Sequence, residues 1–262
     1  MIPTRASAGS RGYLLSFEGG EGGGKGTQIA NLVMYLKALG YPITETREPG
    51  GTLIGNDIRG ILLNPKHAGM DYLTELLLYE ATRAQLLREV IRPALSRGEI
   101  VICDRFADST TVYQGDARGI DLQIIGQLNQ IATNGLRPDY TVLLDLDPII
   151  GLQRIQKRGT PDRLEQEALT FHQRVRQGYL RLAKQEPDRF LVIDASENPT
   201  QIQATIRTAL ITRLCQATWR PKPPDLRQID ASHGGPIPCA ATGCETEPCP
   251  TIRAAQAHDK RP

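Results

Sequence analysis

The sequence predicts an α/β domain in which helices cover both faces of a five-stranded parallel sheet. Five short apolar runs, each typical of a buried strand, alternate with segments of helical periodicity. Such alternation favours parallel strands joined by crossover helices. In addition, a glycine-rich loop follows the first apolar run and opens a helix, an arrangement that α/β domains use to bind phosphate. We expect this domain to span about residues 12–215.

The expected strands are short and rich in β-branched and aromatic residues. In chain order they are YLLSF (13–17), ITET (43–46), EIVIC (99–103), YTVLLDL (140–146) and FLVID (190–194). Helical patterns occupy the remaining intervals, at 25–39, 54–63, 71–96, 122–133, 149–157, 165–185 and 199–214. In the first helix, Ile29, Leu32 and Leu36 share one face, and Gly40 stops it.

Charge and composition favour a cytoplasmic protein with neither a nucleic-acid nor a membrane partner. The 262 residues carry a formal net charge of +2, which is too small to indicate a polyanionic partner. No stretch approaches the roughly 18 apolar residues of a membrane span, and residues 1–12 lack the apolar run of a signal peptide. Five cysteines, an odd number without a disulfide-framework spacing, favour a reducing cytoplasm.

We expect both ends of the chain, residues 1–11 and 216–262, to be disordered. The second segment holds eight of the 18 prolines and no sustained periodicity. Its cysteines allow a zinc interpretation, together with His233 or His258; they are Cys239, Cys244 and Cys249. Structural zinc sites favour closer pairs and four ligands, so a disordered Pro-rich tail is the preferred interpretation.

The glycine-rich loop FEGGEGGGKGTQ (17–28) matches G-x-x-x-x-G-K, the first seven positions of a P-loop. Backbone N–H groups and a helix N-terminus converge on phosphate oxygens in such a loop, and the lysine adds a positive charge. A flexible linker would instead lie between domains. We therefore expect a nucleotide phosphate site formed by Gly19, Gly20, Glu21, Gly22, Gly23, Gly24, Lys25, Gly26 and Thr27.

The eighth position of this loop departs from the usual motif. Gly26 stands where most P-loops have the Ser or Thr hydroxyl that ligates Mg²⁺, and Thr27 follows. Metal contact here should therefore be indirect, through water or carboxylates. The string GKGTQ is also found in adenylate kinases, which indicates a nucleoside-monophosphate kinase. The N-K-x-D string of guanine-specific GTPases is missing.

Three further stretches resemble one family of kinases. REPGGT (47–52), LYEATRAQ (78–85) and DRFADSTTVYQG (104–115), taken with the P-loop, closely resemble bacterial thymidylate kinases from about Gly12 to Leu214. This resemblance implies a P-loop NTPase fold, a homodimer, and Mg²⁺-dependent transfer of the γ-phosphate of ATP to dTMP. The alternatives are another nucleoside-monophosphate kinase, such as an adenylate kinase, and a P-loop regulatory switch without transfer activity.

The resemblance assigns phosphate and metal contacts to residues near the expected sheet edge. Lys25 contacts the ATP phosphates, Asp104 helps to hold Mg²⁺, and Arg105 and Arg47 bind the acceptor phosphate. Pro49 shapes the loop after Arg47. Glu21 reaches the acceptor's 3′-hydroxyl or orients neighbouring arginines, and it requires a cationic partner beside a triphosphate. A mutual surface ion pair of Asp104 and Arg105 is the structural alternative.

Contacts to thymidine are also assigned by resemblance. Tyr79 and Arg83 are four residues apart and share a helix face; Tyr79 would stack on thymine and Arg83 would donate to its carbonyl oxygen. Core packing for Tyr79 and a surface charge for Arg83 are the alternatives. Tyr113 would face the 2′ side of the sugar. Further thymidine contacts are Ser109, Thr110 and Gln114.

The segment RIQKRGTPDRLEQE (154–167), here called the lid segment, resembles the lid of these kinases. Its alternative is a solvated basic helix face. Gly22 stands where some thymidylate kinases carry a catalytic arginine, so the lid segment should supply the cation for the transferring phosphoryl group. We expect Arg158 or Arg163 to do so, and Arg163 first, because it follows the glycine–proline break.

Overall fold

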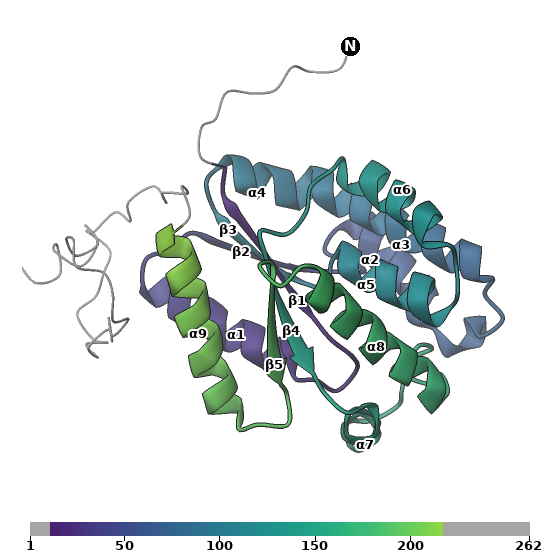
Figure 1. The fold of residues 1–262 in the computed structure, drawn as a ribbon. Helices are drawn as coiled ribbons and strands as arrows, with labels where there is room; N and C mark the ends of the chain where they lie inside the picture. The colour runs from purple at the N-terminus through teal and green to yellow at the C-terminus, as the bar shows by residue number, and fades with distance from the viewer. Residues whose placement is uncertain (1–10, 217–262) are drawn as a thin grey trace, which may run out of the picture.

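A five-stranded parallel sheet forms the centre of the computed structural model, which describes residues 11–216 (Figure 1). The spatial order of the strands is β2-β3-β1-β4-β5, and every neighbouring pair is parallel. The strands are β1 (Tyr13–Glu18), β2 (Ile43–Arg47), β3 (Ile100–Asp104), β4 (Tyr140–Asp145) and β5 (Phe190–Asp194). The predicted fold class is confirmed. The tail with its three cysteines and the predicted N-terminal segment lie outside the described residues, apart from Arg11 and Gln216.

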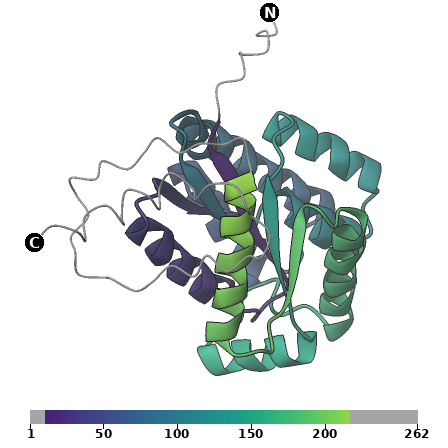
Figure 2. The same cartoon turned by 60° about the vertical axis from the view of Figure 1, so that its left-hand side comes forward.

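Helices cover both faces of the sheet. On one face, α1 (Lys25–Ala38) and α9 (Pro199–Gln216) pack against Leu15 and Phe17 of β1. On the other, Leu14 of β1 packs against the long helical segment that precedes β3, as expected from the alternation of side chains along a strand. Figure 1 shows α1 and α9 side by side, and Figure 2 gives a second view of the same helices. The remaining helices are α2 (Leu53–Leu63), η1 (Pro65–His67), α3 (Tyr72–Leu86), η2 (Leu87–Ile91), α4 (Arg92–Ser96), α5 (Ala107–Thr110), η3 (Thr111–Ala117), α6 (Leu122–Thr133), α7 (Pro148–Arg158) and α8 (Leu169–Gln185).

Two helical segments differ from the sequence prediction. The motif 104–115 contains a helix that periodicity did not indicate, since α5 continues into the π-helix η3. Its residues DSTTV have modest helix propensity, and packing of η3 against α8 supplies the stability that propensity does not. The helix expected from Glu165 begins only at Leu169, because the Asp162 carboxylate accepts the N–H groups of residues 164 and 165 and fixes a turn there. Among the described residues, no helix is long and apolar enough to cross a membrane.

The P-loop and the start of α7 approach one another closely enough to require glycine on both sides. A Cβ on Gly22 would lie 2.4 Å from the Gly151 carbonyl oxygen, and one on Gly151 would lie 2.3 Å from the Glu21 carbonyl oxygen. Gly22 also has a φ of 70°, which favours glycine. The helix α7, in which the lid segment starts, therefore packs directly against the phosphate loop.

We predict that Gly151→Ala destabilises the protein by about 1–3 kcal/mol, because the added methyl group has no space. It should also raise the KM for ATP, since the P-loop must shift. Gly126→Ala is the matched control: a Cβ there meets nothing within 4 Å in the helix α6, so it should stabilise by up to about 1 kcal/mol. Urea unfolding and ATP kinetics compare the two variants. Equal behaviour of both would contradict the close contact.

Candidate active site

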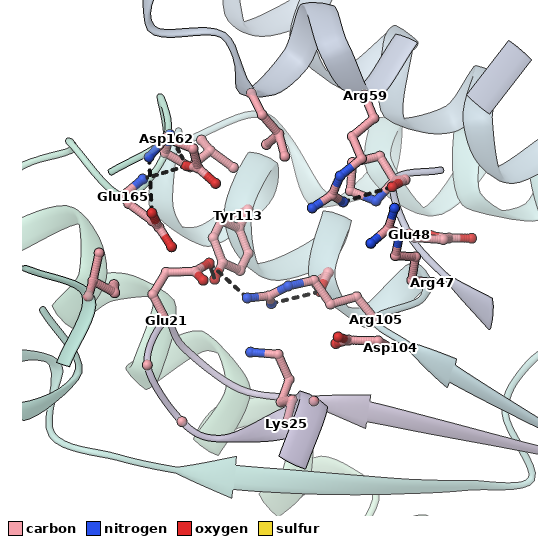
Figure 3. A pocket seen from close by; sticks show the side chains of 18 of the residues that line it. Glu21, Lys25, Arg47, Glu48, Arg59, Asp104, Arg105, Tyr113, Asp162 and Glu165 are labelled. Atoms are coloured by element: carbon pink, nitrogen blue, oxygen red, sulfur yellow. Dashed lines mark hydrogen bonds and ion pairs between the residues drawn. The ribbon is translucent and has the colours of Figure 1, made fainter. Parts of the chain in front are cut away.

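A cavity of about 510 Å³ lies where the chain leaves the carboxyl ends of β1, β2 and β3 (Figure 3). Open α/β sheets bind ligands at this edge. The P-loop follows β1, Arg47 ends β2 and Asp104 ends β3. Of the predicted site residues, those that line the cavity are Glu21, Gly22, Gly23, Gly24, Lys25, Gly26, Thr27, Arg47, Pro49, Tyr79, Arg83, Asp104, Arg105, Ser109, Thr110, Tyr113, Gln114 and Arg158. Gly19, Gly20 and Arg163 do not line it.

The P-loop lysine is held above its own loop. Lys25 Nζ donates to the carbonyl oxygens of Gly19 at 3.1 Å and Gly20 at 2.9 Å. Gly24 adopts a left-handed conformation at the N-cap of α1, and no side chain caps the helix. The first N–H groups of α1 therefore stay available to an anion. Burial and the nearby Arg105 lower the pKa of Lys25 against the effect of neighbouring carboxylates, so a phosphate would restore its charge balance.

Glu21 holds Arg105 over the P-loop. Its Oε1 accepts from Arg105 Nη2 and from the Tyr113 hydroxyl, both at 2.7 Å (Figure 3). Burial opposes ionisation, but Arg105 and Lys25 lower the pKa of Glu21 to about 2. Glu21 thus has the cationic partner that the sequence required. The alternative of a surface ion pair between Arg105 and Asp104 is wrong, because Arg105 pairs with Glu21 and its side chain is only 14% exposed.

Asp104 is suited to hold a cation. Its Oδ1 is buried and has no hydrogen-bond partner, although the residue lines the cavity beside Lys25. No group of three His, Cys, Asp or Glu residues that could hold a metal occurs in residues 11–216. Mg²⁺ is usually held by one or two carboxylates together with substrate phosphates and water. The residues present therefore fit a phosphate-bound Mg²⁺ and not a metal held by protein ligands alone.

Arg83 is a buried, fixed side chain that lines the cavity. It is 1% exposed and donates to Glu48 at 2.6 and 2.9 Å and to Glu80 at 2.7 Å. Its other N–H groups donate to Asn129 at 3.0 Å and to the Phe106 carbonyl at 3.4 Å. The alternative that it is a surface charge is therefore wrong. Tyr79 is 9% exposed and lines the same region. Thr110 Oγ1 is buried without a partner, which leaves a hydroxyl for a ligand.

The buried carboxyl group of Glu18 holds the segment that follows Arg105. Glu18 accepts the Phe106 N–H at 2.7 Å, the Ser109 hydroxyl at 2.7 Å and the Tyr179 hydroxyl at 2.8 Å. Ser109 thus lines the cavity but binds within the protein. Burial, followed by the charge of Asp108, raises the pKa of Glu18 to about 7. Glu18 connects β1 to the residues that follow Asp104 and so helps to orient Arg105.

The lid segment brings one of its two expected arginines to the cavity. Arg158 lines it and pairs with Glu165, while 68% of its side chain is exposed. Arg163 is 5% exposed; its Nε donates to the Leu62 carbonyl at 2.6 Å and its Nη2 pairs with Glu75 at 2.6 Å. The preference for Arg163 is therefore corrected. The turn fixed by Asp162 directs the side chain away from the cavity.

Sequence reasoning missed several residues that line the cavity. Glu48 belongs to the motif REPGGT (47–52) and Asp162 to the lid segment. Their places in these segments are the signal that could have identified both carboxylates. Arg59, whose Nη1 donates to the Pro49 carbonyl at 2.8 Å, comes from α2 and carries no motif. The remaining ones are Leu63, Arg154, Ile155, Leu164 and Glu165. Their convergence depends on how α2, α7 and the lid segment pack.

The chain is similar to proteins of one family. A family model described as thymidylate kinase matches residues 17–206. Thymidylate kinase of Deinococcus radiodurans is 53% identical over 204 residues, which are 78% of this chain and 98% of that protein. That of Solidesulfovibrio magneticus is 50% identical over 199 residues, with coverages of 73% and 95%. A crystal structure of thymidylate kinase from Ehrlichia chaffeensis has a TM-score of 0.62 and 35% identity, and covers 76% of this chain and 99% of that one.

We predict that Glu18 makes the protein less stable as the pH rises from about 5 to 7. The native pKa of about 7 exceeds the unfolded value of about 4.3, so the native state binds more protons between these values and loses stability on deprotonation. The loss should reach about 3 kcal/mol, and Glu18→Gln should remove it. Urea unfolding at about pH 5 and pH 8 compares both proteins. An equal pH slope in the variant would contradict the assignment.

Proposed function

This chain belongs to the thymidylate kinase family, and we propose that the cavity at the carboxyl edge of its sheet is where ATP and dTMP react. The enzyme transfers a phosphoryl group from ATP to dTMP. The alternatives of an adenylate kinase or a non-catalytic switch are not favoured by these relatives. The observation that carries the proposal is one cavity that is lined both by the P-loop lysine and by the buried, fixed side chain of Arg83.

On the donor side, Lys25 and the N–H groups of the loop bind the ATP phosphates. This proposal rests on the uncapped N-terminus of α1 and on Lys25, which now donates only to carbonyl oxygens. We place Mg²⁺ at Asp104, whose buried Oδ1 lacks a partner. Bound there, the ion would neutralise charge on the transferring phosphate. Gly26 offers no hydroxyl, so the remaining ligands would be phosphate oxygens and water.

On the acceptor side, cationic side chains bind the dTMP phosphate and fixed side chains bind its base. Arg105 and Arg47 contact the phosphate, whose oxygen attacks the γ-phosphorus while ADP leaves. Glu21 orients Arg105 through their 2.7 Å ion pair. Tyr79 stacks on thymine. Arg83 donates to it by redirecting its longest hydrogen bond, the one to the Phe106 carbonyl at 3.4 Å. The other proposed base and sugar contacts are Ser109, Thr110, Tyr113 and Gln114, all of which line the cavity together with Pro49.

We also propose a homodimer formed through α2, α3 and α6, which lie side by side (Figure 1). Each contributes apolar side chains that are at least 44% exposed; they are Leu53, Ile54 and Ile61, Leu73 and Leu77, and Ile124 and Ile131. Exposed apolar groups that gather on one side of a protein mark an interaction site. A second copy would cover them.

The kinase domain should be separable from the two ends of the chain. The Deinococcus relative aligns over 98% of its own length with only 78% of this chain, and the family model ends at residue 206. We therefore propose a domain of residues 12–215 that acts without residues 216–262. The buried Cys103 thiol and the use of ATP fit a cytoplasmic enzyme.

The direct test is ADP release with dTMP, dUMP, AMP and CMP as acceptors. We predict that dTMP is used best, and that Lys25→Ala lowers kcat by about a hundredfold or more because it removes charge compensation at the phosphates. Lys37→Ala, on the exposed end of the same helix, is the control and should keep kcat within about twofold. Preference for AMP, or full turnover without Lys25, would overturn the proposal.

We predict that Arg158 supplies the catalytic cation of the lid segment. Arg158→Ala should lower kcat about 10³-fold with little change in the KM for dTMP, since the contact forms in the transition state. Arg163→Ala should lower kcat much less, because its guanidinium is tied to Glu75. Lys157→Ala, an exposed neighbour outside the cavity lining, controls for the charge of α7. A larger loss in Arg163→Ala than in Arg158→Ala would restore Arg163 to the role.

A further inference from the structure

Glu75 is a buried carboxylate without an assigned role, and it joins two parts of the site. It lies in the first turn of α3 and is 0% exposed. Its Oε1 accepts from Gln114 Nε2 at 2.8 Å and from Arg118 Nε at 3.2 Å. Its Oε2 accepts from Arg118 Nη2 at 3.1 Å and pairs with Arg163 Nη2 at 2.6 Å. One side chain thus contacts both η3, which lines the cavity, and the lid segment.

The contact with Gln114 determines which way its amide group faces. A carboxylate can only accept hydrogen bonds, so the NH₂ group of Gln114 must face Glu75. The Gln114 carbonyl oxygen is then the amide atom left for a ligand, because Gln114 also lines the cavity. A carbonyl oxygen matches the N3–H of thymine or uracil. It does not match N3 of cytosine, which is itself an acceptor.

The contact with Arg163 fastens the lid segment to the acceptor side of the cavity. The Arg163 N–H donates to the Leu63 carbonyl at 3.0 Å, and its Nε to the Leu62 carbonyl at 2.6 Å. Leu63 lines the cavity, and so does Arg158 of the same lid segment. Anchoring at Arg163 therefore limits where Arg158 can lie.

Two further groups keep Glu75 ionised. Arg118 lies 4.6 Å from the ring centroids of both Tyr72 and Phe171, which fixes its guanidinium between them. Its Nη1 also pairs with Glu167 at 2.7 Å. The positive charges of Arg118 and Arg163 therefore balance the negative charges of the two glutamates. Burial would raise the pKa of Glu75, but the hydrogen bonds and charge of Arg118, with Gln114 and Arg163, hold it below its ordinary value. Glu75 therefore acts only as an acceptor at neutral pH.

We propose that Glu75 is a positioning residue that sets base selectivity through Gln114 and places the lid through Arg163. It touches no substrate itself. Through Gln114 it favours acceptors with a donor at N3, and through Arg163 it keeps Arg158 at the cavity. This inference rests on the proposed dTMP site.

The base-selectivity half is tested by calorimetric binding of dTMP, dUMP and dCMP to the full chain and to Glu75→Gln. The amide introduced at position 75 can present either a donor or an acceptor to Gln114, so the orientation of the Gln114 amide is no longer fixed. Binding of dTMP and dUMP should weaken about tenfold, the usual effect of one lost hydrogen bond, while dCMP binding changes less than about twofold. Asp116→Asn, which removes an ion pair with Arg181 from the same η3, should leave the three affinities in their original ratios.

The lid half is tested by kcat with Glu75→Gln, Arg163→Gln and the double variant. Each single variant should lower kcat about three- to tenfold, and the double variant little further, because both changes break the same Glu75–Arg163 contact. The double variant also keeps the Arg118–Glu167 pair and the charge balance. It therefore replaces Glu75→Gln in both tests if the single variant fails to fold.

The outcomes separate this inference from the proposed function. Equal weakening of all three nucleotides in Glu75→Gln would reduce Glu75 to a structural residue and overturn the selectivity half. If the loss of kcat in the double variant equalled the product of the two single losses, the lid half would be overturned. If the parent enzyme itself failed to prefer dTMP over dCMP, the proposed acceptor site would be wrong, whatever Glu75 does.

Discussion

The ion pair between Glu21 and Arg105 is the interaction on which the rest of the site depends. Two phosphorylated substrates must meet at one point, so cations have to converge there, and cations repel each other. The pKa of Lys25 is lowered first by burial and then by the charge of Arg105, so the two cations lie close enough to repel each other. Glu21, ionised and 2.7 Å from Arg105, offsets this repulsion. Because Glu21 belongs to the loop after β1 and Arg105 follows β3, the same contact also joins the central strand and its neighbour at their ligand-binding edge.

Arg105 adopts this position at a cost in backbone conformation. Its φ is 71°, a left-handed value that non-glycine residues rarely adopt and that costs about 1 kcal/mol or more. The surrounding hydrogen bonds hold it: its N–H donates to the Phe17 carbonyl at 2.9 Å, and its Nη1 donates to Gly19 at 3.0 Å. Glu18 secures the next residue by accepting the Phe106 N–H. The turn after β3 is therefore held from β1 by both backbone and side chain.

The sequence predicted what local patterns encode and missed what packing determines. Periodicity and the P-loop spacing were enough for the strands, for α1, and for the cavity residues of the phosphate loop. The motif after β3 identified Arg105 and Gln114 but not the helix that carries Gln114, since DSTTV does not favour a helix by propensity. Arg163 was misplaced because nothing local to GTPDR shows that Glu75, 88 residues earlier, would pair with it. Likewise, Arg105 pairs with Glu21 and not with the adjacent Asp104, because the loop after β1 and the turn after β3 meet in space. No local pattern shows this.

The π-helical geometry of η3 (Thr111–Ala117) has a consequence for how this segment can change. A π turn holds about one residue more than an α turn, and this lets neighbours such as Tyr113 and Gln114 both line the cavity. A single deletion that restored α-helical winding would remove this extra residue and leave the later positions nearly in phase. Arg118, after the turn, would still face Glu75, whereas Tyr113 and Gln114, inside it, would change direction. Loss of one residue here would therefore alter the cavity lining and leave the packing of the following segment in place.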